Sequence, residues 1–298
     1  MNVVVVGSQG MLGSDVVAEF QSSGHRVLPL DIGDIDITRA ESVASFLGHV
    51  AGHRFDWCIN CAAYTAVDKA ETEPDLATAV NGLGPGYLAR ACLIAGMRFL
   101  QIGTDFVFDG NKRTPYVESD PALPLGVYGR SKLAGERSAM EANPGTIVAR
   151  TAWLFGPNGS SFPKTMIRAW RAGKKLRVVA DQIGSPTYTG DLARTLREMA
   201  ERDLPPGVYH TAGPDSMSWH ALAHYSIRAY RDQFHPGEPE PIIDPIATED
   251  WPTPAVRPAY SVLSGEKLRA AGIEPMRHLP EAMREFVRRL GSVDRPTS

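Results

Sequence analysis

The sequence predicts an α/β fold in which a doubly wound parallel sheet carries a smaller, α-rich lobe. The first half of the chain alternates short β-branched apolar runs with longer amphipathic segments, which is the pattern of repeated strand and helix units. A glycine-rich turn directly follows the first of these runs. After about residue 150 the alternation weakens and proline and glycine become frequent, which indicates a second unit.

The expected elements follow from these runs. We expect strands at 3–6, 26–30, 57–60, 98–103 and 146–149, and helices at 11–22, 39–47, 75–95 and 127–141. We expect residues 1–150, with about 172–190, to form the sheet unit, and 151–171 with 191–298 to form a substrate-binding lobe. Such lobes often cap the carboxyl ends of sheet strands, where ligands of open α/β folds bind.

Composition and charge exclude several classes of protein. No run of about 18 uncharged apolar residues is present that could cross a bilayer. The net charge of −3 and the scattered basic residues give no reason to expect nucleic acid. The apolar run at the N-terminus is too short for a signal peptide and has no basic flank, so we expect a cytoplasmic protein.

The three cysteines, Cys58, Cys61 and Cys92, lie in apolar stretches. We expect them to be buried thiols rather than a redox pair.

The turn Gly7-Ser8-Gln9-Gly10-Met11-Leu12-Gly13 predicts a dinucleotide site of the Rossmann type. Glycines allow a tight turn and close approach of the backbone to a pyrophosphate, and the start of the following helix supplies free N–H donors. Asp31 ends the second expected strand, where an acid can accept hydrogen bonds from the adenosine ribose, which favours NADH without excluding NADPH. The predicted cofactor-binding residues of this region are Gly7, Gln9, Gly10, Met11, Leu12, Gly13 and Asp31.

Three further residues predict the chemistry. Tyr128 and Lys132 are four positions apart and therefore share one face of a helix, where the ammonium is expected to lower the pKa of the phenol. Tyr128 is then a general acid for a forming alkoxide. Thr104 ends an expected strand, and its hydroxyl can donate to a substrate carbonyl beside Tyr128.

These residues together resemble the extended short-chain dehydrogenase/reductase superfamily, and other segments resemble its dTDP-4-dehydrorhamnose reductase family nearly from end to end. The segments are 60–71 (Asn-Cys-Ala-Ala-Tyr-Thr-Ala-Val-Asp-Lys-Ala-Glu), Val80-Asn81 with Gly84-Pro85, 104–110 (Thr-Asp-Phe-Val-Phe-Asp-Gly), 150–153 (Arg-Thr-Ala-Trp), 181–187 (Asp-Gln-Ile-Gly-Ser-Pro-Thr) and Arg257-Pro258.

The resemblance implies NAD(P)H-dependent reduction of the C4 ketone of dTDP-4-dehydro-β-L-rhamnose to dTDP-L-rhamnose. It implies that Tyr128 protonates the oxygen, that Lys132 holds the nicotinamide ribose, and that Thr104 binds the carbonyl. It further implies a homodimer. The remaining implied contacts are Ala62, Ala63 and Tyr64 with the cofactor, and Thr65, Val67, Asp105, Phe106, Trp153 and Arg257 with the sugar nucleotide.

Two departures from the family pattern keep alternatives open. Phe106 stands where the family usually has tyrosine, so the substrate is alternatively another nucleotide-linked 4-keto-6-deoxysugar. Some members bind magnesium through clustered glutamates, but no matching glutamate is found near 189–191, and we predict no metal.

Other classes of protein are less well matched by the sequence. A 4,6-dehydratase is disfavoured because the second acid after Thr104 is missing, and an epimerase is disfavoured because epimerases lack the 104–110 string. A non-catalytic NAD(P)-binding subunit, like the related regulatory subunit of methionine adenosyltransferase, stays open.

Overall fold

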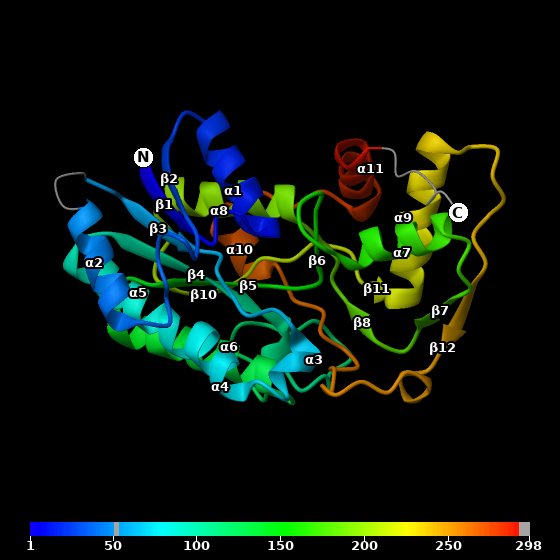
Figure 1. Ribbon diagram of the computed structural model, residues 1–298, viewed down its shortest axis with the longest axis horizontal. Helices are drawn as coiled ribbons and strands as arrows, with labels where there is room; N and C mark the ends of the chain where they lie inside the picture. The colour runs from blue at the N-terminus through cyan, green and yellow to red at the C-terminus, as the bar shows by residue number, and fades with distance from the viewer. Residues whose placement is uncertain (51–53, 292–298) are drawn as a thin grey trace.

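The main layer of the protein is a six-stranded parallel sheet, seen on the left of the computed structural model in Figure 1, which describes residues 1–50 and 54–291. The strand order is β10-β5-β4-β3-β1-β2. The chain winds outward in both directions from β1, so a crevice is expected beyond the carboxyl ends of β1 and β3. The strands are β1 (Asn2–Val6), β2 (Arg26–Leu30), β3 (Trp57–Asn60), β4 (Arg98–Thr104), β5 (Ile147–Thr151) and β10 (Gly207–His210).

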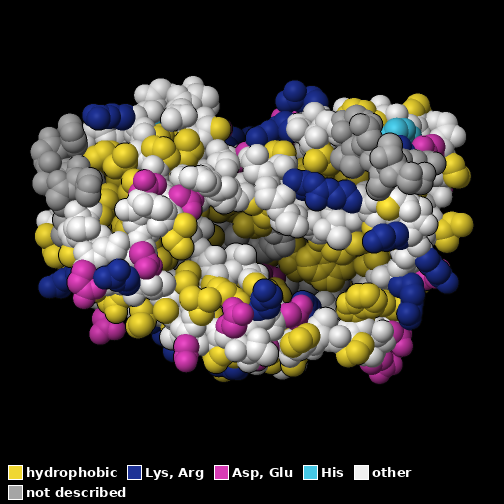
Figure 2. Space-filling model, viewed as in Figure 1, with side chains coloured by type: hydrophobic (Ala, Val, Ile, Leu, Met, Phe, Trp, Pro, Cys, Tyr) yellow, Lys and Arg dark blue, Asp and Glu magenta, His cyan; other side chains and the backbone are white. Residues whose placement is uncertain are grey.

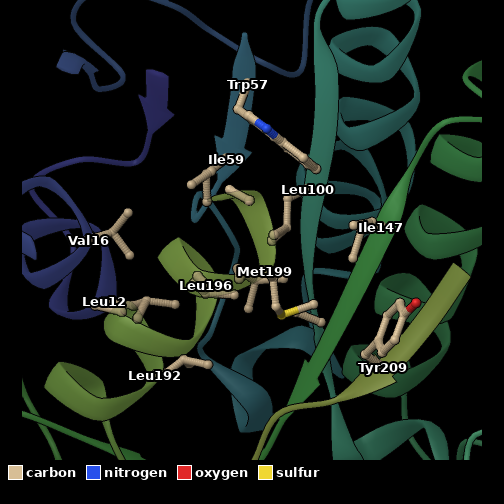
Figure 3. Close-up of a cluster of buried hydrophobic side chains, with 14 of the residues drawn as sticks. Leu12, Val16, Trp57, Ile59, Leu100, Ile147, Leu192, Leu196, Met199 and Tyr209 are labelled. Atoms are coloured by element: carbon tan, nitrogen blue, oxygen red, sulfur yellow. The ribbon is translucent and has the colours of Figure 1, made fainter. Parts of the chain in front are cut away.

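Helices cover both faces of this sheet. The alternation of side chains along β1 sends Val3 and Val5 into one core and Val4 and Val6 into another, which explains the unbroken valine run. The first core is closed by α1 (Met11–Ser22) and α8 (Thr189–Glu201), and the second by α2 (Ala40–Val50), α5 (Gly84–Ile94) and α6 (Val127–Ala142). Figure 3 shows the first core, where Leu192, Leu196 and Met199 of α8 meet side chains of the sheet and of α1.

The lobe lies beside the carboxyl ends of the strands, on the right of Figure 1. Its core is formed by α7 (Phe162–Arg171), α9 (Trp219–Phe234) and α11 (Leu279–Leu290). Short strand pairs complete it: β6 (Leu154–Phe155) with β9 (Thr187–Tyr188), β7 (Leu176–Val179) with β12 (Ile243–Ile246), and β8 (Ile183–Gly184) with β11 (Met217–Ser218). The short helices α3 (Val67–Ala70) and α10 (Glu266–Ala270) lie in the connections.

A partly buried ion pair joins the lobe to the sheet unit. Arg289 of α11 donates to Asp15 of α1 at 2.7 Å and to the Tyr188 hydroxyl at 3.0 Å. Thr189, the first residue of α8, donates to the other oxygen of Asp15 at 2.5 Å. Asp15 is buried, so losing either partner would leave part of its charge without compensation. This contact fixes the position of α11 relative to the sheet.

The expected α/β fold with a parallel sheet is confirmed, and the expected strands and helices of the first half are found within a few residues. One expected helix, 75–95, is instead divided into α4 (Pro74–Thr78), a π-helical turn (Ala79–Leu83) and α5. Pro85 lies at the start of α5 and has no N–H to continue an α-helical ladder, which is the physical reason for the break.

The structure also differs from the expected division of the chain into two units. Residues 207–210, expected in the lobe, form the edge strand β10 of the main sheet, and α8 packs on that sheet. Residues 176–179, expected with the sheet unit, form β7 and pair with β12 of the lobe. These strands have four residues each, which is too short for a period-two pattern to reveal their sheet.

We predict that Leu196→Ala destabilises the protein by about 2 to 5 kcal/mol, because it opens a cavity in the core between α8 and the sheet. The measurement is the midpoint of urea unfolding. Leu93→Ala is the matched control, since Leu93 on α5 is 45% exposed and its truncation should change stability by at most about 0.5 kcal/mol. Equal effects of the two substitutions would contradict the burial pattern.

Candidate active site

A cavity of about 970 Å³ lies between the carboxyl ends of the strands and the lobe. Figure 2 shows the surface hollowed at this place. All of the predicted site residues except Gln9 and Gly13 line it. Lining residues that the sequence did not indicate include Cys61, Ile102, Ser160, Ser161, Phe162 and Trp219.

The glycine turn brings the start of α1 to the cavity. Gly7 has a φ of 77°, and a Cβ there would lie 2.6 Å from the Ala62 nitrogen, so both the conformation and the close packing require glycine. Gly13 does not line the cavity. It allows close packing of α1 on the glycine turn, because a Cβ there would lie 2.0 Å from the Gly7 oxygen. Gly10, Met11 and Leu12 line the cavity at the helix start, which is a suitable place for a phosphate group.

Asp31 stands at the end of β2 beside this turn. Its carboxylate accepts a hydrogen bond from the Gln9 backbone nitrogen at 2.8 Å, so Gln9 contributes through its backbone. Asp31 and a second acid, Asp36, both line the cavity. The lysine and arginine that line the cavity, Lys132 and Arg257, are carried by other segments.

The loop after β3 forms the next part of the wall through Ala62, Ala63 and Tyr64. The side chain of Asn81 fixes this loop, because it accepts from the Tyr64 nitrogen at 2.9 Å and donates to the Tyr64 oxygen at 3.0 Å. Asn81 is itself buried and also donates to Ser131 of α6 at 3.1 Å. This explains why a polar residue stands inside the helical segment after α4.

Tyr128 and Lys132 lie on the cavity side of α6, as their spacing predicts. The expected lowering of the phenol pKa by Lys132 is wrong. Burial raises the pKa of Tyr128 to about 12, opposed by a hydrogen bond with Thr104 and assisted by the charge of Asp105. The Lys132 ammonium instead donates to the Ile102 oxygen at 2.6 Å, and burial lowers its pKa to about 8. Tyr128 is therefore a protonated phenol at neutral pH, which suits a proton donor.

Thr104 and Asp105 lie where β4 ends, next to Tyr128. The Thr104 hydroxyl donates to Asp105 Oδ1 at 3.2 Å, and Ser261 donates to Asp105 Oδ2 at 2.6 Å. Asp105 is 2% exposed, and burial raises its pKa to about 6 in spite of these two hydrogen bonds. Phe106 packs its ring edge-on against Tyr128, with 5.5 Å between the ring centroids.

Trp153 and Trp219 form an aromatic surface on the lobe side of the cavity. Their rings stack with 3.5 Å between centroids and an interplanar angle of 6°, and Trp219 donates to Gln182 at 3.2 Å. Trp153 has a φ of 45°, a left-handed conformation that costs about 1 to 3 kcal/mol for a residue other than glycine. Trp219 begins α9, far from Trp153 in the sequence, so no motif could have linked them.

Two acids of the 60–71 segment hold other parts of the site in place. Asp68 binds the guanidinium of Arg257 at 2.9 and 3.0 Å, and Arg257 holds the pKa of Asp68 below its ordinary value. Arg257 reaches the cavity as expected, but with its charge already paired. Glu71 accepts from the Val127 nitrogen at 2.8 Å and so caps the helix that carries Tyr128.

Ser161 has a buried hydroxyl without a hydrogen-bond partner among the described residues, and the residue lines the cavity. It belongs to the loop before α7, which Lys164 holds by donating to the Pro157 and Gly159 oxygens at 2.8 and 2.7 Å. An orphaned buried hydroxyl on a cavity wall is available to a ligand. Serine in a Gly-Pro-rich loop gave no signal of this in the sequence.

The acids of the described residues do not form a metal centre. No group of three or more His, Cys, Asp or Glu side chains is arranged to hold an ion within 1–50 and 54–291. Asp15 of α1 and Asp191 of α8 are engaged in ion pairs with Arg289 and Arg277. In the same part of the chain, no helix combines the length and apolar character that crossing a bilayer requires.

The fold and the site together define an oxidoreductase of the short-chain dehydrogenase/reductase class, with a glycine turn, a strand-end hydroxyl and a Tyr-Lys helix around one cavity. The chain belongs to the RmlD substrate binding domain family, whose sequence profile matches residues 1–292.

Named relatives agree with this membership. A dTDP-4-dehydrorhamnose reductase from Streptomyces griseus is 42% identical over 98% of this chain and 95% of its own. A probable dTDP-4,6-dihydroxy-2-methyloxan-3-one 4-ketoreductase from Streptomyces antibioticus is 38% identical over 96% of this chain and 94% of its own. The crystal structure of a dTDP-4-dehydrorhamnose reductase from Bacillus anthracis str. Ames in complex with NADP is 35% identical and superposes with a TM-score of 0.88, covering 96% of this chain and 98% of that one.

We predict that Glu71→Ala destabilises the first turn of α6 by about 0.5 to 2 kcal/mol, because the Val127 N–H loses its acceptor. The measurement is hydrogen exchange of the α6 backbone amides, which should accelerate at the start of the helix. Glu141→Ala, an exposed substitution in the last turn of the same helix, is the control. Unchanged exchange at the start of α6 would show that Glu71 is not its cap.

Proposed function

We propose that this protein reduces the C4 ketone of dTDP-4-dehydro-β-L-rhamnose to dTDP-L-rhamnose, with NADH or NADPH as the reductant. The observation that carries the proposal is the convergence of Thr104, Tyr128 and Lys132 on one cavity that also holds the glycine turn. Family membership and the names of the relatives support the substrate.

The cavity fits a dinucleotide at its sheet side. The cradle at Gly7, which a Cβ would fill, together with the start of α1 suits the pyrophosphate, and Asp31 suits the adenosine ribose. Ala62, Ala63 and Tyr64 line the same cavity and would contact the cofactor, and Lys132 would donate to the second ribose. A bound reduced nicotinamide supplies the hydride.

Tyr128 is the proton donor in this scheme. Its pKa of about 12 keeps the phenol protonated until negative charge develops on the substrate oxygen. The Lys132 ammonium lies on the same helix face and stabilises the phenolate that proton transfer leaves. Thr104 gives the keto oxygen a second hydrogen-bond donor.

The lobe side of the cavity fits the sugar nucleotide. The stacked indoles of Trp153 and Trp219 offer a flat apolar surface to a deoxysugar, and Phe106 adds a ring beside Tyr128. Thr65, Val67, Asp105 and Arg257 complete the proposed substrate contacts.

We accordingly assign cofactor binding to the sheet unit and sugar-nucleotide binding mainly to the lobe. We place the reaction, which uses two soluble nucleotides, in the cytoplasm. A homodimer, implied by the resemblance, stays a prediction.

A related substrate is the second candidate. Phe106 removes a hydroxyl that the family pattern places near the sugar, and one relative is named as a ketoreductase of a different dTDP-linked sugar. Parallel assays with dTDP-4-dehydrorhamnose and other dTDP-4-keto-6-deoxysugars distinguish the two by the higher kcat/KM. Binding of the cofactor without turnover of any of these sugars would instead favour a non-catalytic subunit.

We predict that Tyr128→Phe lowers kcat by about 10²- to 10⁴-fold, because the keto oxygen loses its proton donor. Turnover is followed by the absorbance of the reduced nicotinamide with dTDP-4-dehydrorhamnose. Tyr225→Phe is the control, since Tyr225 is an exposed phenol of α9 that does not line the cavity. Near-normal turnover by Tyr128→Phe would remove Tyr128 from the proposed role.

We predict that the wild type has a higher kcat/KM with NADH than with NADPH, because a 2′-phosphate would face the Asp31 carboxylate. Asp31→Ala should lower kcat/KM for NADH by about tenfold, the effect of a lost charged hydrogen bond, while sparing NADPH. Glu274→Ala, at an exposed acid, is the control. An equal loss with both cofactors would mean that Asp31 acts only by supporting the glycine turn.

A further inference from the structure

We propose that Ser261 fixes the carboxyl proton of Asp105 on the oxygen that faces Thr104, so that neutral Asp105 donates to Thr104 and frees the Thr104 proton for the substrate's keto oxygen. This inference rests on the proposed ketone reduction. It gives Ser261 a positioning role in that reaction and specifies the protonation state of Asp105 in which the enzyme works.

Ser261 belongs to a return segment, residues 257–263, that crosses the end of β4. Two isolated strand contacts hold the segment on either side of Ser261, one between Tyr260 and Ile183 and one between Leu263 and Tyr116. The Ser261 nitrogen also donates to the Ile183 oxygen at 2.8 Å. Ser261 is 1% exposed, so water does not compete for its hydroxyl. The backbone therefore sets where this hydroxyl points.

The Asp105 carboxyl has a hydroxyl at each oxygen. Ser261 donates to Oδ2 at 2.6 Å, and Thr104 lies 3.2 Å from Oδ1. A hydroxyl has one proton to donate, and an ionised carboxylate can only accept. When Asp105 is ionised, Thr104 gives its proton to Oδ1 and has none left for a ligand.

Protonation of Asp105 reverses the bond to Thr104. Oδ2 already accepts from Ser261, so the added proton occupies Oδ1 and points to the Thr104 oxygen. Thr104 then accepts from Asp105 and its own proton becomes free to turn toward the cavity, which Thr104 lines beside Tyr128. Without Ser261, the carboxyl proton could occupy either oxygen of Asp105. With the proton on Oδ2, Asp105 could not donate a hydrogen bond to Thr104.

The surroundings of Asp105 shift its titration toward the neutral form. The neighbours are the hydroxyls of Thr104 and Ser261, the Phe106 backbone and, from α6, the titratable Tyr128, which is an uncharged phenol at neutral pH. Burial raises the pKa of Asp105 to about 6. Binding of substrate removes further water from the carboxyl and should raise this pKa again.

The proton balance leaves these three residues unchanged. Ser261, Asp105 and Thr104 each keep their own proton and form a chain of donors that ends on the keto oxygen. Hydride from the reduced cofactor forms the new C–H bond, and the proton that makes the new hydroxyl comes from Tyr128. The chain only stabilises the charge that develops on the oxygen.

Asp105→Asn is the central test, because an amide reproduces the neutral acid. Its oxygen can accept from Ser261 while its NH₂ group donates to Thr104. Below about pH 6, where wild-type Asp105 is neutral, kcat/KM of Asp105→Asn for the keto sugar should stay within about threefold of wild type, whereas Asp105→Ala should lose about tenfold or more. Above that pH, Asp105→Asn should exceed wild type, because the wild-type acid ionises and the amide does not.

The pH profile supplies a readout that a purely structural role would not change. Asp105 is neutral below its pKa, so wild-type kcat/KM should be full at low pH and fall as pH rises through about 6. Asp105→Asn should lack this fall and keep the one near 8 that neutralisation of Lys132 produces.

Ser261 is tested in the same way. Ser261→Ala should lower kcat by about tenfold, and Ser261→Thr should restore it because it retains the hydroxyl. Ser264→Ala, directly after the return segment, is the matched control, because the Ser264 hydroxyl accepts from the Glu266 nitrogen at 3.4 Å and does not contact Asp105.

The outcomes separate this inference from the proposed function. An inert wild type overturns the proposed function and this inference with it. An active wild type with an Asp105→Asn variant as inactive as Asp105→Ala shows that the ionised acid is needed and overturns the inference alone. If circular dichroism shows that Asp105→Asn does not fold, the wild-type profile decides, since a kcat/KM that does not fall above about pH 6 also overturns it.

Discussion

The site depends on the close packing of α6 against the end of β4. A Cβ at Gly129 would lie 2.3 Å from the Phe106 oxygen, so the first turn of α6 touches backbone where a larger residue could not fit. This contact brings Tyr128 beside Thr104 and lets Lys132 reach the Ile102 oxygen. One turn further on, Glu136 and Arg150 form a buried ion pair at 2.8 Å that ties α6 to β5. The catalytic geometry is thus a consequence of helix-on-sheet packing.

The lobe completes the site from elements that are distant in sequence. The pair Asp15 and Arg289 fixes α11 on the sheet unit, while Trp219 of α9 supports Trp153 in a strained conformation. Such strain persists only where surrounding contacts hold the residue, and here the stacked partner does so. The return segment then brings Ser261 to Asp105. The Asp15–Arg289 and Ser261–Asp105 contacts would be lost if the lobe were displaced.

Burial controls the protonation of the proposed active site more than neighbouring charges do. It raises the pKa of Tyr128 and Asp105 and lowers that of Lys132, which in each case favours the uncharged form. The sequence argument, which considered only the helical neighbour of Tyr128, reached the opposite sign for its pKa.

The sequence by itself determined the parallel α/β architecture, the glycine turn at Gly7, and the spacing that places Tyr128 and Lys132 on one face. These follow from local periodicity and backbone conformation, which a few neighbouring residues specify. The tertiary structure decided that β10 and α8 belong to the sheet, that Trp219 supports Trp153, that Glu71 caps α6, and that Ser261 binds Asp105. Those contacts join residues far apart in the chain, and burial, which sets the pKa values, exists only once such segments have packed together.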